Sequence, residues 1–357
     1  MFVTDDFGPY GTRRDDAVEK ALALDHRRLV RVDSAYAVAP GEVTTGTGAP
    51  YKVFTPFYRS WRAHGWSAPA AEPASPRWAS GVRSEPLPAA PDLGATTILP
   101  PGELAGRRRL AEFGDRVASY AEGRNVPGGD LTSRLSPYLR FGCLHPRQVL
   151  DAVDDDRFRT EVAWREFYAA VLAFFPDSAR TAFRPGMAAL EVDTGPDADR
   201  RFDAWVHGRT GYPIVDAGMR QLAGEAWMHN RVRMITASFL VKDLHLDWRR
   251  GARLFMARLQ DGDLASNQHN WQWVAGTGTD PSPFFRIFNP TAQGKKFDPD
   301  GTYVRRWVPE LRDVDATHVH EPWKLPGGTP SGYPSPIVDH AEERREALAR
   351  YGRRSRG

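Results

Sequence analysis

The sequence predicts a mainly helical protein with a small α/β segment at its amino terminus. Two β-like runs at residues 2–4 and 29–32 flank a helical pattern over 13–23, the order of a β-α-β unit. Eight prolines then lie between residues 66 and 101, which indicates a long, extended linker. From residue 104 to 310 apolar residues recur at helical spacing without the alternation of a strand.

These patterns divide the chain into four parts. Residues 1–62 form a partial α/β domain, because one β-α-β unit cannot cover both faces of a parallel sheet. Residues 63–104 are a proline-rich linker, and 105–320 are an all-helical domain. Residues 321–357 form a loop that contains several prolines, followed by a charged helix over 338–351.

Within the helical domain, the spacing of Leu110, Phe113, Val117 and Tyr120 predicts one continuous helix. Residues 162–175 predict a second helix, which Pro176 ends. Three more helices are expected, over residues 213–222, 227–245 and 253–259.

Composition excludes several classes of protein. The 357 residues are 41% hydrophobic and 26% charged, as in a soluble globular protein, and no apolar run is long enough to cross a membrane. The single cysteine, Cys143, excludes a disulfide framework and a multi-thiolate zinc site. The first residues lack a basic flank and an apolar run, so we expect no secretory signal and a cytoplasmic location. We also expect no metal site. The net charge of +3 permits a nucleic-acid partner without requiring one.

Hydroxyl side chains cluster just before a predicted helix start at Ser136, where Thr132 and Ser133 flank Arg134. Hydroxyls, a guanidinium and free helix amides at one point would suit an anion. An ordinary helix cap uses the same residue types. The local pattern does not separate the two interpretations.

The acidic pair Asp261 and Asp263, with Gly262 between them and Asn267 nearby, resembles a calcium loop at first sight. Calcium is excluded because the remaining ligand positions hold Ala265 and Gln272. Asp263 could cap a helix that starts at Leu264. The pair could also bind a polar ligand such as a ribityl chain or a flavin edge, and both interpretations remain open.

Two helical faces carry side chains suited to binding a base. Glu161, Trp164, Arg165 and Tyr168 share one face, which is either a core face with an exposed ion pair or the lining of a base-binding pocket. Asn230, Arg233 and Met234 share another, where an amide could meet a heterocycle edge. Trp271 and Trp273 are two residues apart on a helix, so their rings should face different surroundings. The common phosphate-loop, nucleophile-elbow and zinc-helix signatures are absent.

Taken together, these motifs resemble the DNA photolyase/cryptochrome family, and most closely its microbial cyclobutane pyrimidine dimer photolyases. The resemblance covers most of the chain. The stretches that carry it are PYKVFTPFYRSW (50–61), LTSRLSPYLRFGCLHPRQ (131–148), WREFY (164–168), GRTGYPIVDAGMRQL (208–222), GEAWMHNRVRMITASFLVKDL (224–244), DGDLASNQHNWQWVAGTGTD (261–280) and FFRIFNPTAQGKKFDPDG (284–301).

The resemblance implies an α/β (Rossmann-like) antenna domain, a wrapping linker and a helical domain that binds FAD. It also implies residue roles. The residues expected to bind the cofactor are Tyr120, Thr132, Ser133, Arg134, Leu135, Ser136, Arg233, Asp261, Gly262, Asp263 and Asn267. Those expected at the lesion are Glu161, Trp164, Asn230, Met234 and Trp273. Those expected to contact DNA are Arg124, Arg165, Tyr168, Arg231 and Arg286.

The implied activity is light-dependent DNA repair by a deoxyribodipyrimidine photo-lyase. Reduced, photoexcited FAD would transfer an electron to a flipped-out pyrimidine dimer and split it. The implied partner is double- or single-stranded DNA that contains dimers, bound by a monomer without a membrane. The alternative is a cryptochrome-like blue-light receptor that binds FAD without repair.

The sequence departs from the family pattern in two places. The first strands of the antenna domain, about 80 residues, would be missing, which leaves a sheet edge exposed, and we expect no antenna chromophore. Trp271 and Trp248 match the inner and middle members of the family's electron-transfer chain, but residues 190–201 contain no tryptophan for the outer one. We therefore expect inefficient photoreduction of oxidised FAD.

Overall fold

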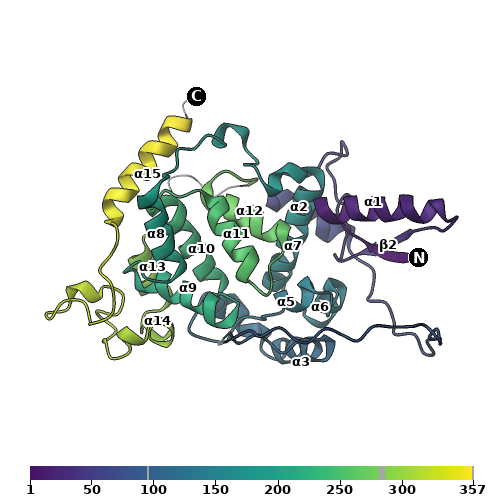
Figure 1. Cartoon of the computed structure of the whole chain (residues 1–357), viewed down its shortest axis with the longest axis horizontal. Helices are drawn as coiled ribbons and strands as arrows, with labels where there is room; N and C mark the ends of the chain where they lie inside the picture. The colour runs from purple at the N-terminus through teal and green to yellow at the C-terminus, as the bar shows by residue number, and fades with distance from the viewer. Residues whose placement is uncertain (95, 281–285, 356–357) are drawn as a thin grey trace.

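The computed structural model, which describes residues 1–94, 96–280 and 286–355, has a small β-α-β unit beside a large group of helices (Figure 1). The mainly helical class that the sequence predicts is confirmed. The elements of the amino-terminal part are β1 (Phe2–Asp5), α1 (Pro9–Leu24), β2 (Val30–Ser34) and α2 (Phe54–His64).

Strands β1 and β2 pair in parallel, as a β-α-β connection requires. Phe2 lies opposite Val30, and the register is irregular between Val3 and Asp5. Phe2 is 74% exposed and Val32 43%, so the two strands leave apolar surface uncovered. Both predicted strands and the helix between them are confirmed.

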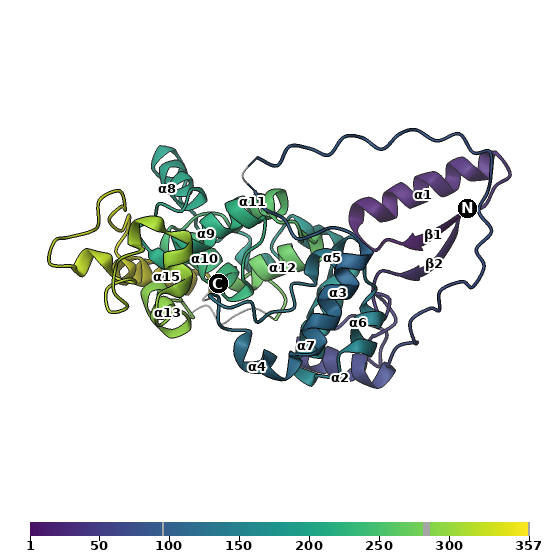
Figure 2. The same ribbon diagram turned by 90° about the horizontal axis from the view of Figure 1, so that it is seen from below.

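The linker has no helix or strand from residue 67 to 101 within the described residues. Figure 2 shows it as a long extended trace that leaves the helices and returns to them. On its return, Thr97 N donates to the Gly224 carbonyl at 2.7 Å, and Leu99 N donates to Gln260 Oε1 at 3.2 Å.

The remaining chain is helical, with no strand among its described residues. Its α-helices are α3 (Glu103–Gly114), α4 (Tyr120–Gly123), α5 (Ser136–Arg140), α6 (Pro146–Ala152), α7 (Asp156–Phe174), α8 (Pro196–Val206), α9 (Pro213–Glu225), α10 (Asn230–Ser238), α11 (Trp248–Arg258), α12 (Leu264–Ala275), α13 (Pro290–Phe297), α14 (Thr302–Trp307) and α15 (His340–Ser355). The short turns are η1 (Val117–Ser119), η2 (Pro176–Ala179), η3 (Pro185–Met187), the π-helical η4 (Phe239–Asp243), η5 (Pro309–Leu311) and η6 (Pro322–Lys324). No helix in these ranges is long and apolar enough to cross a membrane.

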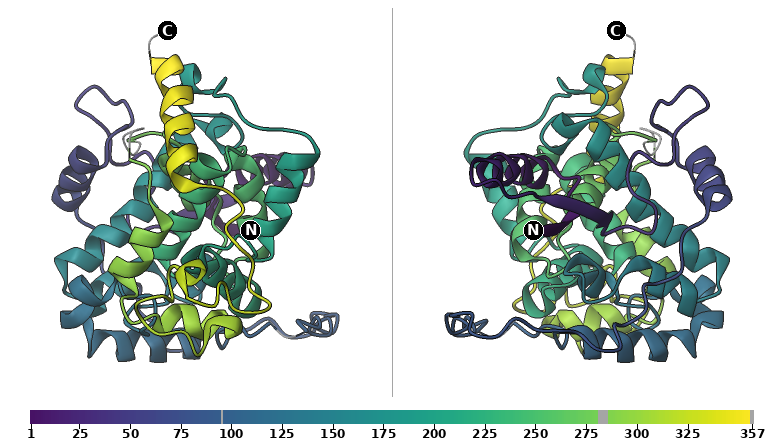
Figure 3. Two further views of the ribbon diagram at one scale, coloured as in Figure 1. Left: turned by 90° about the vertical axis from the view of Figure 1, so that its left-hand side faces the viewer. Right: turned by 90° about the vertical axis from the view of Figure 1, so that its right-hand side faces the viewer.

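Two apolar clusters form the core. One gathers around α2 and α7 and includes Trp61 and Phe167, each 0% exposed. The other gathers around α9, α10 and α12 and includes Trp205 and Ile214. Helix α12 contacts α7, α10 and α11, so it joins the two clusters. In the right-hand view of Figure 3 the β-α-β unit, in purple, lies in front of these helices. Most polar residues of the candidate site lie on these central helices and on the loops between them.

The predicted single helix through residues 110–120 is wrong. Helix α3 ends at Gly114, and η1 and α4 follow as separate turns. Glycine is a poor helix former, and the bend brings the Phe113 and Tyr120 rings to 5.5 Å between centroids. A straight helix would separate the two residues by about 10 Å along its axis.

The predicted helices at 227–245 and 253–259 exist with different bounds. Helix α10 starts only at Asn230, because the His229 ring caps it by accepting a hydrogen bond from Arg231 N at 3.1 Å. Helix α11 starts earlier than predicted, at Trp248, where Asp247 Oδ1 accepts from Arg249 N at 2.9 Å. A histidine cap is a weak sequence signal, which explains the late start that the pattern missed.

Candidate functional site

A hydrogen-bonded junction joins the hydroxyl cluster to the acidic pair. Asp261 lies in the loop before α12, and its side chain is 3% exposed. Its Oδ2 accepts from Ser136 Oγ, at the start of α5, at 2.6 Å. It also accepts from Arg233 Nη2, on α10, at 2.8 Å. Three predicted cofactor residues from distant parts of the chain therefore meet at one buried carboxylate.

The loop before α5 is held in a fixed shape. Arg109 Nε donates to the Ser133 carbonyl at 2.8 Å, and its Nη2 donates to the Thr132 carbonyl at 3.2 Å. Arg134 has φ +49°, a left-handed conformation that is uncommon for a residue with a side chain. Its guanidinium lies 4.3 Å from the Trp227 ring centroid. Strained backbone of this kind is often found where a loop shapes a binding site.

The loop around Gly262 is tied to the same region. Arg140 Nε, at the end of α5, donates to the Gly262 carbonyl at 2.7 Å. A Cβ at Gly262 would lie 3.2 Å from the Leu259 carbonyl oxygen, so glycine suits this close turn. The two ends of α5 thus hold both sides of the acidic loop.

Asp263 is a helix cap, one of the two interpretations that the sequence left open. Its Oδ1 accepts from Ser266 N at 2.8 Å and starts α12. One turn later, Asn267 Nδ2 donates to the Ala252 carbonyl at 3.0 Å. The cap fixes the position of Asn267 relative to Asp261.

A second polar group contains Tyr120, Arg124 and Glu161. The Arg124 guanidinium lies 5.6 Å from the Tyr120 ring centroid and donates to Glu161 Oε1. Arg157 Nη2 is 3.2 Å from the same Glu161 oxygen. Glu161 is 26% exposed, so it combines two cationic neighbours with access to solvent.

Helix α10 presents its first turn beside this group. Asn230 is exposed at the first helical position. Arg231 donates to Asn125 Oδ1 at 2.7 Å, lies 4.4 Å from the Phe297 ring centroid, and has its Nη1 3.9 Å from Met234 Sδ. Arg231 therefore contacts one predicted lesion residue, Met234.

The buried His229 ring reports a positive electrostatic environment. Burial lowers its pKa to about 3, with further lowering by the guanidiniums of Arg233, Arg231, Arg134 and Arg124. The histidine is therefore neutral at physiological pH. Four converging guanidiniums favour anions such as phosphates.

Two predicted DNA contacts lie elsewhere. Tyr168 is 3% exposed and stacks on the His269 ring at 5.4 Å, so it belongs to the core. Arg165 Nη1 donates to the Ala35 carbonyl at 3.0 Å, and its guanidinium lies 4.5 Å from the Tyr36 ring centroid. The amino-terminal segment thus engages Arg165, whereas Tyr168 is enclosed in the core and cannot reach DNA without a rearrangement.

The remaining predicted contact, Arg286, is exposed, and its carbonyl accepts from Lys242 Nζ at 2.7 Å. The preceding part of its motif, residues 284 and 285, lies outside the described residues.

Trp271 and Trp273 face different surroundings, as their spacing predicts. Trp271 is 2% exposed, with Phe255 at 5.0 Å and Trp205 at 6.2 Å between ring centroids. Trp273 is only half-buried.

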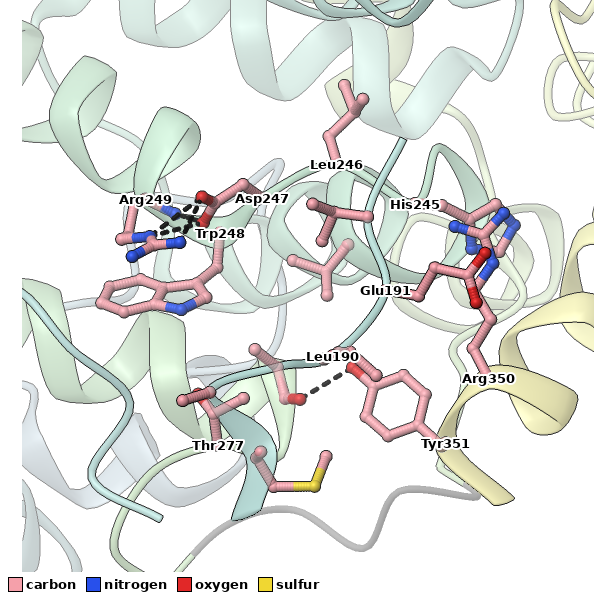
Figure 4. A pocket seen from close by; sticks show the side chains of 15 residues that line it. Leu190, Glu191, His245, Leu246, Asp247, Trp248, Arg249, Thr277, Arg350 and Tyr351 are labelled. Atoms are coloured by element: carbon pink, nitrogen blue, oxygen red, sulfur yellow. Dashed lines mark hydrogen bonds and ion pairs between the residues drawn. The ribbon is translucent and has the colours of Figure 1, made fainter. Parts of the chain in front are cut away.

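Trp248 lines a recess between the start of α11, the loop before α8 and the end of α15 (Figure 4). The stretch that lacks the expected outer tryptophan contributes Leu190 and Glu191 to this recess. Tyr351 enters it from α15 and donates its hydroxyl to the Ala275 carbonyl at 2.7 Å. The stretch thus supplies an aliphatic and a carboxylate side chain to the recess, and Trp248 is the only indole among the described residues that line it.

Comparison with known proteins identifies the chain. The FAD binding domain of DNA photolyase matches residues 158–353, more than half of the chain, and the DNA photolyase domain matches residues 1–76. The chain belongs to the DNA photolyase family. The family resemblance predicted from the motifs is confirmed.

Relatives of this photolyase include two bacterial proteins named deoxyribodipyrimidine photo-lyase. That of Streptomyces griseus is 45% identical over 351 residues, which cover 94% of this chain and 75% of the relative. That of Escherichia coli (strain K12) is 43% identical over 359 residues, which cover 95% and 75%.

Solved structures share its fold. A class III photolyase from Agrobacterium tumefaciens superimposes with a TM-score of 0.91 at 40% identity and covers 100% of this chain and 79% of its own. A Synechocystis cryptochrome superimposes with a TM-score of 0.86 at 29% identity, covering 97% and 78%. The fold alone therefore does not separate repair from sensing.

The residues of this photolyase fit FAD, as the matched domain requires. His229 Nε2 is a buried nitrogen that lacks a hydrogen-bond partner in the described part of the chain. A buried donor without a partner is costly, and an acceptor oxygen of a ligand would satisfy it. Ser136 and the start of α5 add further donors.

Sequence reasoning missed His229 and Glu166. His229 stands directly before α10 and caps it, but histidine is not among the residues usually found at a helix cap, so the sequence pattern gave little signal. Glu166 is buried inside the WREFY motif and accepts hydrogen bonds from the amino-terminal segment. Its partners lie more than 100 residues away, so no local pattern could have identified them.

Proposed function

We propose that this chain is a deoxyribodipyrimidine photo-lyase that repairs pyrimidine dimers in single- or double-stranded DNA as a monomer. The observation that carries the proposal is the junction at Asp261, which joins Ser136 and Arg233 near the arginines that lower the pKa of His229. The two relatives named deoxyribodipyrimidine photo-lyase, at 45% and 43% identity over most of the chain, favour repair over sensing.

The cofactor would be held from several sides. Ser136 and the loop before it would supply donors to the diphosphate, and Arg134 would add charge. Asp261, oriented by Arg233, would accept hydrogen bonds from the polar edge of the ring system. The other proposed contacts are Tyr120, Thr132, Ser133, Leu135, Gly262, Asp263 and Asn267. When bound, FAD supplies the light-excited electron that splits the dimer.

The lesion would lie beside the cofactor, outside the DNA stack. Trp164 and Trp273 would stack on its bases, a contact worth about 1–3 kcal/mol per base. Glu161, held by Arg124, would hydrogen-bond a carbonyl or ring nitrogen of the dimer, and Asn230 and Met234 would complete the wall. Arg124, Arg231 and Arg286 would bind phosphates without reading sequence.

Glu161 gives a direct test of the lesion site. Glu161→Ala removes one hydrogen bond of about 1 kcal/mol to the dimer, so repair yield per bound dimer should fall roughly three- to tenfold. Repair is measured by thymine absorbance under saturating DNA, and affinity by fluorescence anisotropy. Glu122→Ala, at an exposed position on α4, is the matched control and should keep the wild-type yield. An unchanged yield in Glu161→Ala would contradict the proposed role.

We further propose that Trp271 and Trp248 carry electrons to oxidised flavin, and that this transfer is inefficient because no outer tryptophan adjoins Trp248. Under a reductant in the light, flavin reduction should be slow, while chemically reduced protein should repair at full yield. Introducing an indole by Leu190→Trp, at a position that lines the same recess as Trp248, should accelerate photoreduction. Fast photoreduction of the wild-type protein would contradict the proposed inefficiency if it persists after every nearby aromatic residue except Trp248 and Trp271 has been replaced.

A further inference from the structure

The middle of α7 is an interface with the first 62 residues. Three consecutive residues of the WREFY motif, Trp164, Arg165 and Glu166, each contact this amino-terminal part. The family motif that supplies a proposed lesion-binding ring is therefore also the motif that anchors the α/β segment. The two roles are physically connected along one turn of helix.

Glu166 is the anchor of this interface. Its side chain is buried and accepts from Ala37 N at 2.5 Å, from Val38 N at 3.1 Å and from Trp61 Nε1 at 2.6 Å. These donors come from the loop after β2 and from α2. Three hydrogen bonds to one buried carboxylate fix α2 against α7, because breaking any of them would leave a buried polar group unpaired.

Anchoring α2 places Phe54, its first residue, directly on Trp164. The two ring centroids are 3.6 Å apart with an interplanar angle of 7°, a close parallel stack. Phe54 is 7% exposed, whereas Trp164 is half-buried and retains accessible surface.

Phe54 is also tied to the end of α12. Its backbone N donates to Asp280 Oδ2 at 3.0 Å, and Thr279 Oγ1 donates to the Lys52 carbonyl at 2.5 Å. Residues 279 and 280 follow the helix that carries Trp273. Phe54 is thus held between the two helices that provide the proposed stacking rings.

We infer that Phe54 is a positioning residue for lesion recognition: it holds the plane of the Trp164 indole so that a flipped-out base can stack without ordering the ring first. This inference rests on the proposed function. It gives residues 35–61 a part in substrate binding as well as in supporting the fold. A preorganised ring loses less conformational freedom on binding, which increases affinity.

The test compares variants of two phenylalanines on the same helix. Phe54→Leu keeps an apolar side chain but removes the stack, and Phe54→Tyr retains it. Phe57→Leu is the matched control, because Phe57 is 3% exposed on α2 and packs on Phe167 and Tyr51. The readout is the ratio of dissociation constants for undamaged and dimer-containing oligonucleotides, measured with the FAD-loaded full chain.

The stack predicts that Phe54→Leu lowers this ratio roughly three- to tenfold, the usual strength of an aromatic pair. Phe54→Tyr and Phe57→Leu should retain the wild-type ratio. If Phe54 has a purely structural role, Phe54→Leu will weaken binding of both oligonucleotides alike, or Phe57→Leu will lower the ratio as much as Phe54→Leu does. Either result would overturn the inference. If Phe54→Leu does not fold, Phe54→Met conserves the volume and carries the same test.

Trp164→Ala separates failure of the inference from failure of the proposed function. If Trp164→Ala lowers the ratio and Phe54→Leu does not, the positioning role is wrong and the lesion site stands. If Trp164→Ala leaves the ratio unchanged, Trp164 does not recognise the lesion, and both the inference and that part of the proposed function are wrong.

Discussion

At the scale of single residues, Asp261 is the side chain on which cofactor binding most depends. Asp261→Asn would weaken the pairing with Arg233 and leave its partly buried guanidinium without its counter-ion. We expect FAD retention, measured as the 450 nm to 280 nm absorbance ratio after gel filtration, to fall at least about tenfold, a loss of about 1.4 kcal/mol in FAD binding.

Asp247→Asn is the control for this change. Asp247 also precedes a helix, and it pairs with Arg249, but it lies at α11 away from the junction. It should retain flavin as the unchanged protein does. Equal retention in both variants would show that Asp261 does not hold the cofactor.

His229 predicts how stability depends on pH. Its pKa in the folded state is about 3, below the ordinary 6.5, so the unfolded chain binds the proton first as pH falls. The contribution of the neutral His229 ring to the free energy of unfolding is present above pH 6.5. It is lost as the pH falls from 6.5 to 3, by at most about 1.4 kcal/mol per pH unit. His229→Asn keeps a capping side chain and should flatten the acid slope of the unfolding free energy, measured by urea denaturation.

The exposed His26 provides the comparison. His26→Asn should keep the slope of the unchanged protein, because this side chain is in solvent. If the acid slope of the unfolding free energy is unchanged in His229→Asn, the pH dependence of stability comes from other groups.

At the scale of elements, the crossing of α11 and α12 depends on one glycine. A Cβ at Gly251 would lie 2.1 Å from Cη2 of Trp271 and 2.7 Å from Leu240 Cδ2. Gly251→Ala should therefore cost about 1–3 kcal/mol of unfolding free energy and move the indole, which tryptophan fluorescence would report. Gly114→Ala, at the end of α3 where nothing lies within 4 Å, should be neutral or slightly stabilising. Equal stability of the two variants would contradict the packing described.

Elements were predictable where the signal was local. The strands, α1 and α9 follow from apolar spacing, and Asp263 follows from capping chemistry. Helix α7 also follows from apolar spacing, but it begins at Asp156 rather than at residue 162, because Asp155 caps it. The break after Gly114 and the late start of α10 were not predictable, since they depend on the Phe113–Tyr120 contact and on a histidine cap. Periodicity records which face of a helix is apolar, but it does not record where tertiary contacts interrupt the helix.

The site shows the same limit. Hydroxyls, carboxylates and guanidiniums could be selected by chemical type, and the structure joins Ser136, Arg233 and Asp261. Arg165 and Tyr168 could not be assigned, because the segments that cover them lie about 100 or more residues away in the chain. Helical spacing placed both on the same face as Trp164 without showing what covers that face.

At the scale of the whole molecule, the arginines predict salt-dependent binding to DNA. Arg286→Gln should lower the slope of log affinity against log salt by about 1, equally for damaged and undamaged DNA, since it removes one phosphate contact. Arg345→Gln, on the exposed face of α15, should leave the slope unchanged. Loss of affinity confined to damaged DNA would instead place Arg286 at the lesion.

The whole account is tested most directly by repair itself. The purified full chain is loaded with FAD, reduced anaerobically, mixed with an oligonucleotide that contains a thymine dimer, and illuminated with blue light while absorbance near 260 nm is followed. We predict that thymine absorbance recovers in the light and stays constant in the dark. Folded protein that retains reduced flavin and binds the oligonucleotide, yet leaves the absorbance unchanged under illumination, would contradict the proposal that this chain is a photo-lyase.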